Sequence, residues 1–206
     1  MTSRPVPIEV EAVLRSHQHD LAGVLARAFH DDPIWEWVFP DAAARARRLP
    51  PLFRRFLRHA ERRRDTLRTT VGRQGVALWR PPGGWRDTGW NQVRLALAMA
   101  PLFRDALDRI AVLGATVESR HPDEPHWYLA TLGTDPSAQG RGIGSALLTD
   151  KLASCDAEGI PAYLETETAT NVAFYARHGF VVREEVDVPR GGPHMWFMWR
   201  EPRLPE

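Results

Sequence analysis

The alternation of apolar and polar residues predicts a short N-terminal strand followed by helices. Within residues 8–14, Ile8, Val10 and Ala12 alternate with Glu9 and Glu11, which is the period-two pattern of a strand with one buried face. Residues 19–29 repeat apolar side chains at helical spacing, and Pro33 ends that segment. A second helical stretch, residues 41–64, begins at an aspartate suited to capping, and we expect the pair Pro50-Pro51 to interrupt it.

The middle of the chain predicts a strand pair and then a helical region. Residues 66–70 and 75–79 have strand composition and are separated by a glycine turn. The prolines and glycines of residues 81–84 break regular structure. Residues 90–118 follow, and we expect two helices that meet at Pro101.

The C-terminal third alternates strands and helices. We predict strand, helix, strand, helix, strand and strand at residues 127–134, 143–157, 162–166, 171–177, 180–188 and 195–200. A strand–helix–strand order favours parallel pairing, whereas a final pair of strands joined by a turn favours antiparallel pairing. The sequence therefore predicts one α/β domain over residues 1–206, with a mixed central sheet flanked by helices and a helical insertion at about 85–120 between the third and fourth strands.

Composition excludes several classes of protein. The chain has 206 residues, of which 43% are hydrophobic and 26% charged, as in soluble globular proteins. With 27 basic and 26 acidic residues, no global charge selects nucleic acid or a membrane surface. The longest apolar run, Leu95–Phe103, is too short to cross a bilayer, and residues 1–7 lack an apolar signal core. We expect a cytoplasmic protein without a nucleic-acid or membrane partner, as a monomer or a homodimer.

The most informative segment is the glycine-rich turn Gln139-Gly140-Arg141-Gly142-Ile143-Gly144-Ser145, which lies between a predicted strand and a predicted helix. Alternate glycines let the backbone approach a ligand closely. The first amides of the following helix have no partner within the helix, and the helix dipole favours negative charge there. The turn is therefore a candidate phosphate site, the alternative being a glycine-rich connection without a ligand.

Two common phosphate-binding patterns do not fit this turn. No Lys-Ser or Lys-Thr pair follows the glycines, as a P-loop requires. In the dinucleotide pattern G-x-G-x-x-G, the third glycine position is occupied by Ser145 or Leu147, and too little chain follows Glu165 for a doubly wound unit. The remaining pattern, Gln-x-x-Gly-x-Gly, resembles the pyrophosphate loop of the GNAT N-acetyltransferases.

The resemblance extends to both sides of the turn. Residues 127–136 look like the strand before the GNAT loop, and Leu164-Glu165-Thr166 with Asn171-x-x-Phe174-Tyr175-x-x-x-Gly179-Phe180 look like the strand and helix after it. Within the family, residues 121–199 are most similar to puromycin N-acetyltransferase-like enzymes. The resemblance implies a GNAT fold with splayed middle strands and an enzyme that uses acetyl-CoA. Because no activated nucleophile is visible, we expect direct transfer in a ternary complex.

The resemblance also implies where acetyl-CoA binds, namely between the splayed strands at residues 129–134 and 162–166. The main chain of Leu132, Gly133 and Thr134 would pair with pantetheine as an added strand does. The turn residues Gln139, Gly140, Arg141, Gly142, Ile143, Gly144 and Ser145 would hold the pyrophosphate. Asn171 and Phe174 would complete the site, although Asn171 could instead cap its helix.

Amine acetylation needs a neutral amine and a proton for the departing thiolate. Tyr175 matches the acid residue of the family, and a phenol with a pKa near ~10 is protonated at neutral pH. Its alternative is a core tyrosine. Glu165 shares a strand face with Tyr163 and Glu167 and could accept the amine proton or orient the ammonium. Its alternative is a structural ion pair with an arginine.

The amine is expected to bind near Asp31 and Asp32, in the loop that borders the acceptor pocket in this family, unless these residues form an ordinary turn. Trp35 follows directly, and an aromatic pocket suits a bulky, partly apolar amine. Among residues 196–199, at most one alternating pair can face a pocket. We predict a small-molecule primary amine, for example an aminonucleoside antibiotic such as puromycin, and hence antibiotic resistance. The alternatives are a peptide or protein amine, or a silent acyl-CoA-binding sensor.

Other features are interpreted as structural. The arginine-rich run between Arg45 and Arg64 predicts a solvated helix face rather than a nucleic-acid site. Cys155, the single cysteine, is on an apolar helix face and is expected in the core. The 8 histidines lack metal-ligand spacing, so we predict no metal. Ser145 has no histidine motif beside it, which argues against a hydrolase.

Overall fold

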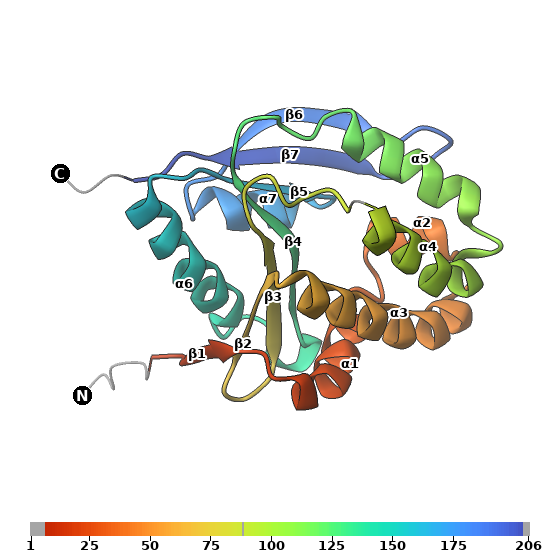
Figure 1. Ribbon diagram of the computed structural model, residues 1–206, viewed down its shortest axis with the longest axis horizontal. Coiled ribbons are helices and arrows are strands. Elements are labelled where there is room, and N and C mark those ends of the chain that lie inside the picture. Colours follow the sequence, from red (N-terminus) through yellow and green to blue (C-terminus); the bar gives the residue numbers. More distant parts are fainter. Residues whose placement is uncertain (1–6, 88, 204–206) are drawn as a thin grey trace.

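The computed structural model describes residues 7–87 and 89–203, and the segment considered for a signal lies, apart from Pro7, outside these ranges. Seven strands form one sheet in the order β1-β2-β3-β4-β5-β7-β6 (Figure 1). They are β1 Val10–Ala12, β2 Thr66–Thr70, β3 Gly75–Arg80, β4 Trp127–Thr134, β5 Ala162–Thr166, β6 Val181–Asp187 and β7 His194–Arg200. Only the β4–β5 pair is parallel, which confirms the predicted mixed sheet.

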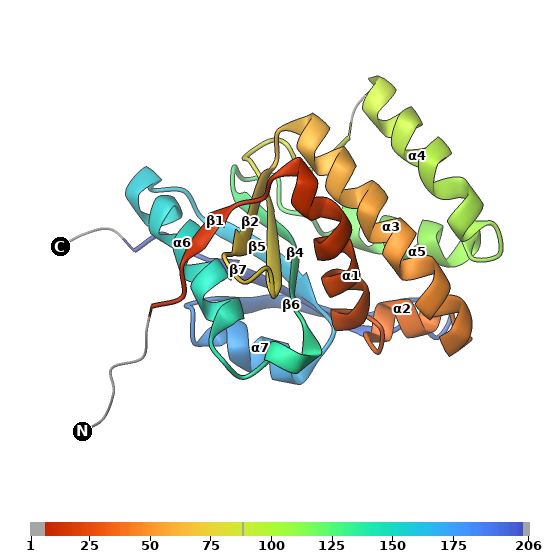
Figure 2. The ribbon, with the colours of Figure 1, turned by 90° about the horizontal axis from the view of Figure 1, so that it is seen from below.

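Helices cover both faces of the sheet (Figure 2). They are α1 Gln18–Ala28, α2 Pro33–Val38, α3 Ala42–Arg63, α4 Gly89–Phe103, α5 Leu107–Glu118, α6 Ile143–Glu158 and α7 Ala169–Ala176, with 3-10 turns η1 Arg15–His17 and η2 Pro136–Ala138. Helices α1 to α5 lie on one side, whereas α6 and α7 lie on the other. The insertion between β3 and β4 consists of α4 and α5, as predicted. Within the described residues, none of the helices has the length and apolar character needed to span a bilayer.

The two middle strands separate soon after they meet. Strands β4 and β5 pair only through Trp127 with Ala162 and Tyr128 with Tyr163. Beyond these residues, the rest of β4 has no strand partner on its β5 side within the part of the chain that the structure describes. This confirms the predicted splay, and it leaves the main chain of residues 129–134 available at the opening between the strands.

A glycine brings α1 close to the splayed part of β4. A Cβ atom at Gly133 would lie 2.8 Å from Leu25 Cδ2 and 3.0 Å from Phe29 Cε2, closer than real side chains tolerate. Leu21 and Leu25 on the same helix are fully buried in the core beneath it. Because Gly133 has no side chain, α1 can pack closely against β4 at this position.

Two predictions about proline were wrong. Helix α3 continues through Pro50 and Pro51 without interruption. The buried residues Leu49, Leu52 and Phe53 belong to the core cluster that includes α1, and this packing outweighs the hydrogen bonds that the prolines remove. The insertion breaks at residues 104–106 instead of at Pro101, which lies in the last turn of α4.

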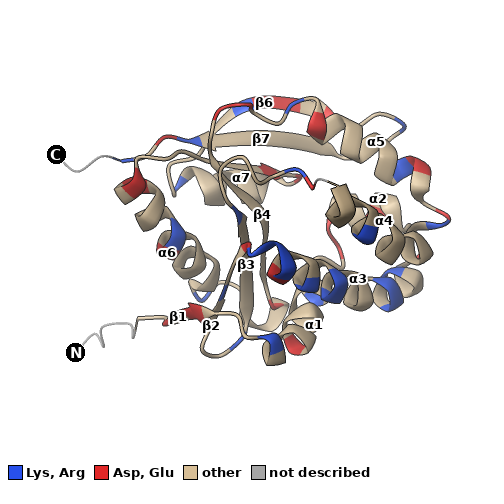
Figure 3. Cartoon of the chain, in the orientation of Figure 1, with Lys and Arg blue, Asp and Glu red and all other residues tan. Residues whose placement is uncertain are grey.

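The arginines of α3 form a solvated face only in part. Arg47, Arg54, Arg58 and Arg62 are exposed, and Figure 3 shows basic residues along this helix. Arg45 is buried instead, because its guanidinium donates to the carbonyl oxygens of His30, Phe39 and Pro40 at 2.9–3.0 Å. Arg45 therefore anchors the loops around α2, whereas the exposed arginines form the solvent-facing side of α3. Cys155 is buried in the core, as predicted.

Candidate active site

The glycine-rich turn presents its amides to a cleft. Gly140 and Gly142 have φ angles of 74° and 83°, in the left-handed region that glycine adopts without strain. Gly142 is the N-cap of α6, and no side chain caps this helix. Within residues 7–87 and 89–203, the amides of residues 140–145 donate to no other protein group. They are therefore available to an anion.

The cleft has a volume of about 820 Å³ and runs from the turn along β4 to α7. The structure brings together almost all predicted cofactor residues in its walls, namely Leu132, Gly133, Thr134, Gln139, Gly140, Gly142, Ile143, Gly144, Ser145, Asn171 and Phe174. Arg141 is the exception, because it is exposed and does not line the cleft. The uncapped turn and the unpaired edge of β4 fit the pyrophosphate and pantetheine parts of coenzyme A.

Asn171 does not cap its helix. Helix α7 begins at Ala169, and the Oγ1 of Thr168 accepts a hydrogen bond from the Asn171 amide at 3.2 Å. Since Thr168 supplies the cap, the side chain of Asn171 is not needed for capping, and Asn171 lies in the wall of the cleft.

A second cavity, of about 340 Å³, opens beside the cleft on the face covered by α2 to α5. Its walls are mostly apolar and come largely from the helices, including Trp35, Phe53, Phe56, Leu95, Met99, Phe103, Leu113 and Val117. The helical insertion therefore supplies one wall. Cleft and cavity share Phe29, Asp32, Leu132, Asn171 and Tyr175, so the two spaces meet at these residues.

Three carboxyl groups line the apolar cavity: Asp32, Glu165 and Glu167. Burial raises the pKa of Asp32 to about 6, although its hydrogen bonds from the first amides of α2 oppose the shift. Burial, followed by the charges of Asp32 and Glu165, raises the pKa of Glu167 well above its ordinary value. Carboxyl groups in an apolar wall attract a cation such as an ammonium. The sequence places Glu167 on the face of Glu165 but carries no signal that Glu167 belongs to the site.

Tyr175 lies where the cleft and the cavity meet and is 7% exposed. Burial raises the pKa of its phenol, and the neighbouring Glu167 and Asp32 raise it further. The hydroxyl is therefore protonated throughout the physiological pH range, as a proton donor requires. Tyr175 also packs against Phe174 and Phe180, so its core role and its position at the site coexist.

Several predicted acceptor residues lie elsewhere. The side chain of Asp31 is 83% exposed, pairs with His30, and does not line either space. None of residues 196–199 lines the cavity, whereas Met195 on the same strand does. Ser145 does have a histidine beside it, since His178 Nε2 lies 3.1 Å from its Oγ. Among the described residues, no cluster of three or more His, Cys, Asp or Glu side chains is placed to bind a metal.

Comparison with known proteins decides the family. The model of the acetyltransferase (GNAT) family matches residues 77–180, half of the chain, which include the turn, both splayed strands and α7. The chain belongs to the GNAT family. It is an N-acetyltransferase, and family membership makes acetyl-CoA its acetyl donor.

Relatives of this GNAT enzyme span most of its length. An uncharacterized N-acetyltransferase of Schizosaccharomyces pombe is 25% identical over 193 residues, covering 88% of this chain and 78% of the relative. A Corynebacterium glutamicum structure, named as histone acetyltransferase HPA2 and related acetyltransferase, has a TM-score of 0.71 at 27% identity, covering 97% and 99% of the two chains. A Salmonella typhimurium protein solved with acetyl-CoA has a TM-score of 0.57 at 13% identity, covering 98% and 97%, which shows the shared fold.

Replacing Asp32 with asparagine is expected to stabilise the GNAT domain at pH 8. The folded pKa of about 6 exceeds the unfolded value of 3.8, so the stability linked to this group is complete below the lower pKa and is lost as the pH rises through the higher one. Asparagine caps α2 equally well and carries no charge, so we expect a gain of roughly 1–3 kcal/mol at pH 8 and almost none at pH 4.

Thermal unfolding of the wild type and of Asp32→Asn at both pH values measures this difference. Asp31→Asn is the matched control, because the neighbouring carboxylate is exposed. If Asp32→Asn were no more stable than the wild type at pH 8, the ionised Asp32 carboxylate would not destabilise the folded state.

Proposed function

We propose that this enzyme acetylates the primary amine of a small, largely apolar molecule. The observation that carries the proposal is the apolar cavity with three carboxyl groups that meets the cleft at Asp32, Asn171 and Tyr175. Its volume of about 340 Å³ is at the small end of the range for small-molecule sites, roughly 300–1,000 Å³. An aminonucleoside such as puromycin belongs to this class of amine, and acetylating it would confer resistance.

Different residues of the cleft bind different parts of acetyl-CoA. The amides of residues 140–145 face its pyrophosphate, and the free edge of β4 at residues 132–134 pairs with pantetheine. The amide of Asn171 binds the same arm near the junction with the cavity. When bound, acetyl-CoA supplies an activated thioester carbonyl at the junction.

Residues at the junction supply the proton transfers. Tyr175 Oη donates a proton on the cleft side, where a thiolate must be neutralised. On the cavity side, Asp32 attracts the ammonium and Glu167 can hydrogen-bond it, and the Glu165 carboxylate accepts the proton that the ammonium must lose before it can attack. The apolar walls exclude water and strengthen these interactions.

A thiol-release assay with acetyl-CoA and a panel of amines tests the proposal. The panel contains arylalkyl amines, an aminonucleoside, a polyamine, an amino sugar, a histone-tail peptide and a peptide with a free N-terminus. We expect turnover to be fastest with primary amines that carry an apolar or aromatic group. Fastest turnover with a peptide would indicate that the preferred acceptor is a peptide or protein amine. Binding of acetyl-CoA without turnover of any amine would indicate a sensor.

Enlarging the cavity is expected to change the choice of amine. Met99 lies in the wall formed by α4, so Met99→Ala removes side-chain volume without altering a charge. We expect kcat/KM for the bulkiest amine of the panel to rise relative to the smallest by roughly 3–30-fold, the range that a few methylene groups produce. Leu97→Ala on the exposed side of the same helix is the control, because Leu97 is 70% exposed. An unchanged ratio in Met99→Ala would argue against binding of the amine in this cavity.

A further inference from the structure

Behind Glu165, away from the cavity, lies a buried pair of histidines. The Glu165 side chain is 7% exposed, and its Oε1 lies 3.7 Å from Nδ1 of His121, whose side chain is fully buried. Nε2 of His121 lies 3.0 Å from Nε2 of His126. Nδ1 of His126 in turn lies 2.6 Å from the carbonyl oxygen of Glu124. The four groups therefore form a chain that begins at the wall of the cavity.

Hydrogen-bond chemistry fixes where the protons of this chain lie. The carbonyl of Glu124 can only accept, so Nδ1 of His126 carries a proton. Burial lowers the pKa of His126, which favours its neutral form with Nε2 as an acceptor. His121 must then donate from Nε2, which leaves its Nδ1 as an acceptor facing Glu165.

Glu165 Oε1 and His121 Nδ1 are both buried, and neither meets a hydrogen-bond partner at bonding distance among residues 7–87 and 89–203. The buried hydroxyl of Tyr163, which also has no partner, lies beside Glu165 and can donate to it, but it leaves His121 Nδ1 unpaired. Buried polar atoms without partners are costly, so two facing acceptors need a reason. The 3.7 Å between these atoms is just beyond hydrogen-bond distance, and one additional proton would draw them together and satisfy both. Such a proton is what the amine must lose during the reaction.

Aromatic rings surround His121 and fix the orientation of its imidazole. The ring of Trp85 stacks on its imidazole with 3.8 Å between the centroids, and Tyr128 and Tyr163 contact it edge to face at 4.9 and 4.8 Å. An indole face stabilises a neighbouring cation. Besides Glu165, the ionisable groups around this cluster include the two phenols, whose pKa values burial raises above the ordinary range, the Glu124 carboxylate near His126, and the Arg86 guanidinium, which lies 4.5 Å from the centroid of the Trp85 ring.

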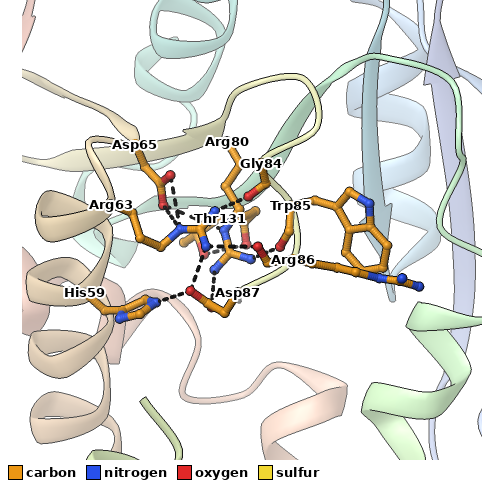
Figure 4. A network of polar contacts seen from close by, with 10 residues as sticks. His59, Arg63, Asp65, Arg80, Gly84, Trp85, Arg86, Asp87 and Thr131 are labelled. Carbon is orange, nitrogen blue, oxygen red and sulfur yellow. Dashed lines mark hydrogen bonds and ion pairs between the residues drawn. The ribbon is translucent and has the colours of Figure 1, made fainter. Parts of the chain in front are cut away.

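A network of charged residues holds Trp85 in this position (Figure 4). Arg63 on α3 binds the carbonyl oxygens of Gly84 and Arg86 and the carboxylate of Asp87, and His59 donates to the same carboxylate at 2.7 Å. Arg80 on β3 donates to the carbonyl oxygen of Trp85 at 2.6 Å. Anchoring on both sides of Trp85 fixes the loop over His121 and shields the imidazole from water.

We propose that Glu165, His121 and His126 act together as the base of the reaction, resting on the acetyltransferase function proposed above. The ammonium N–H bond breaks as an O–H bond forms at the cavity-facing oxygen of the Glu165 carboxylate, and rotation of the carboxyl group turns that O–H toward His121. That proton is then shared with Nδ1 of His121, whose Nε2 remains bonded to His126. The free electron pair stays on the amine nitrogen. After the product leaves, the proton returns to solvent through the cavity, so one ammonium proton is released in each turnover.

His126→Phe tests the part of the chain most distant from the cavity. Phenylalanine preserves the edge-to-face contacts that the ring makes with Tyr163 and Trp199 but cannot accept a hydrogen bond. We expect kcat to fall by roughly 10-fold or more, KM for the amine to change less than 2-fold, and the acidic limb of kcat/KM to move along the pH axis. A residue that only packs would lower the unfolding temperature and leave the pH profile in place.

His121→Ala gives a second readout through chemical rescue. Imidazole should restore part of its activity, whereas pyrazole, which has a similar shape but is far less basic, should not. His194→Phe is the control, because this histidine is in an exposed hairpin and should leave rate and pH profile unchanged. In the free enzyme, the side-chain nitrogen NMR signal of His121 Nδ1 should shift in Glu165→Gln, because the facing carboxylate is gone.

The outcomes separate the two proposals. An inactive wild type with every amine would overturn the proposed function. An active wild type whose pH profile is the same in His126→Phe, with no rescue of His121→Ala by imidazole and an unchanged Nδ1 signal in Glu165→Gln, would overturn only the role of the histidines.

Discussion

Replacing Tyr175 with phenylalanine is expected to lower kcat by roughly 10²–10⁴-fold, the range for losing a positioned general acid. The phenol lies where the cleft and the cavity meet, and burial raises its pKa, so the wild type holds this proton throughout the physiological pH range. Phenylalanine keeps the ring between Phe174 and Phe180. Acetyl-CoA affinity and the unfolding temperature should therefore change little.

The leaving group offers a sharper test of this role. An acetyl donor whose thiol has a lower pKa needs less help from an acid, so the difference between wild type and Tyr175→Phe should shrink with that donor. Calorimetry with acetyl-CoA verifies that binding is intact. An equal defect with both donors, or turnover as fast as in the wild type, would remove Tyr175 from the chemistry and leave it as a core residue.

Local patterns were enough to predict a phosphate-binding turn, and the resemblance to the GNAT family added the remaining residues of the predicted cofactor site. The glycine turn, the strands around it and the helix with Asn171 and Tyr175 lie within one continuous segment, and each signal depends on neighbouring residues. The left-handed conformations of Gly140 and Gly142 follow directly from glycine at those positions. The splay between β4 and β5 was predicted through family resemblance, because no local pattern shows where two strands separate.

The acceptor side depends on contacts between distant segments, and there sequence reasoning was less complete. Period two placed Glu167 beside Glu165, but only the approach of Asp32 from α2 shows that both face one cavity. The contact between His121 and Glu165 joins positions 121 and 165 through the pairing of β4 with β5. The spacing of the histidines along the sequence gives no sign of such a cluster. The rule that proline interrupts a helix failed for Pro50 and Pro51, because the packing of α3 in the core outweighs the lost hydrogen bonds.

Replacing Gly142 with valine is expected to weaken acetyl-CoA binding by roughly 10–100-fold, or about 1.4–2.8 kcal/mol. Gly142 has φ 83°, and a left-handed β-branched residue costs on the order of 1–3 kcal/mol. A Cβ atom there would lie 3.7 Å from Ile8 Cδ1, an ordinary contact, so the strain comes from the backbone and not from collision. Relaxing that strain rotates the adjoining amides away from the cleft.

Gly191→Val separates this effect from simple destabilisation. Gly191 has φ 72° in the β6–β7 turn, and a Cβ atom there meets nothing within 4 Å, so valine imposes comparable strain far from the cleft. Both variants should lose unfolding temperature, but only Gly142→Val should lose affinity for acetyl-CoA in calorimetry. Gly142→Ala should fall between wild type and valine, because alanine tolerates the left-handed region better. Wild-type affinity in Gly142→Val would mean that the amides at the start of α6 do not hold the pyrophosphate.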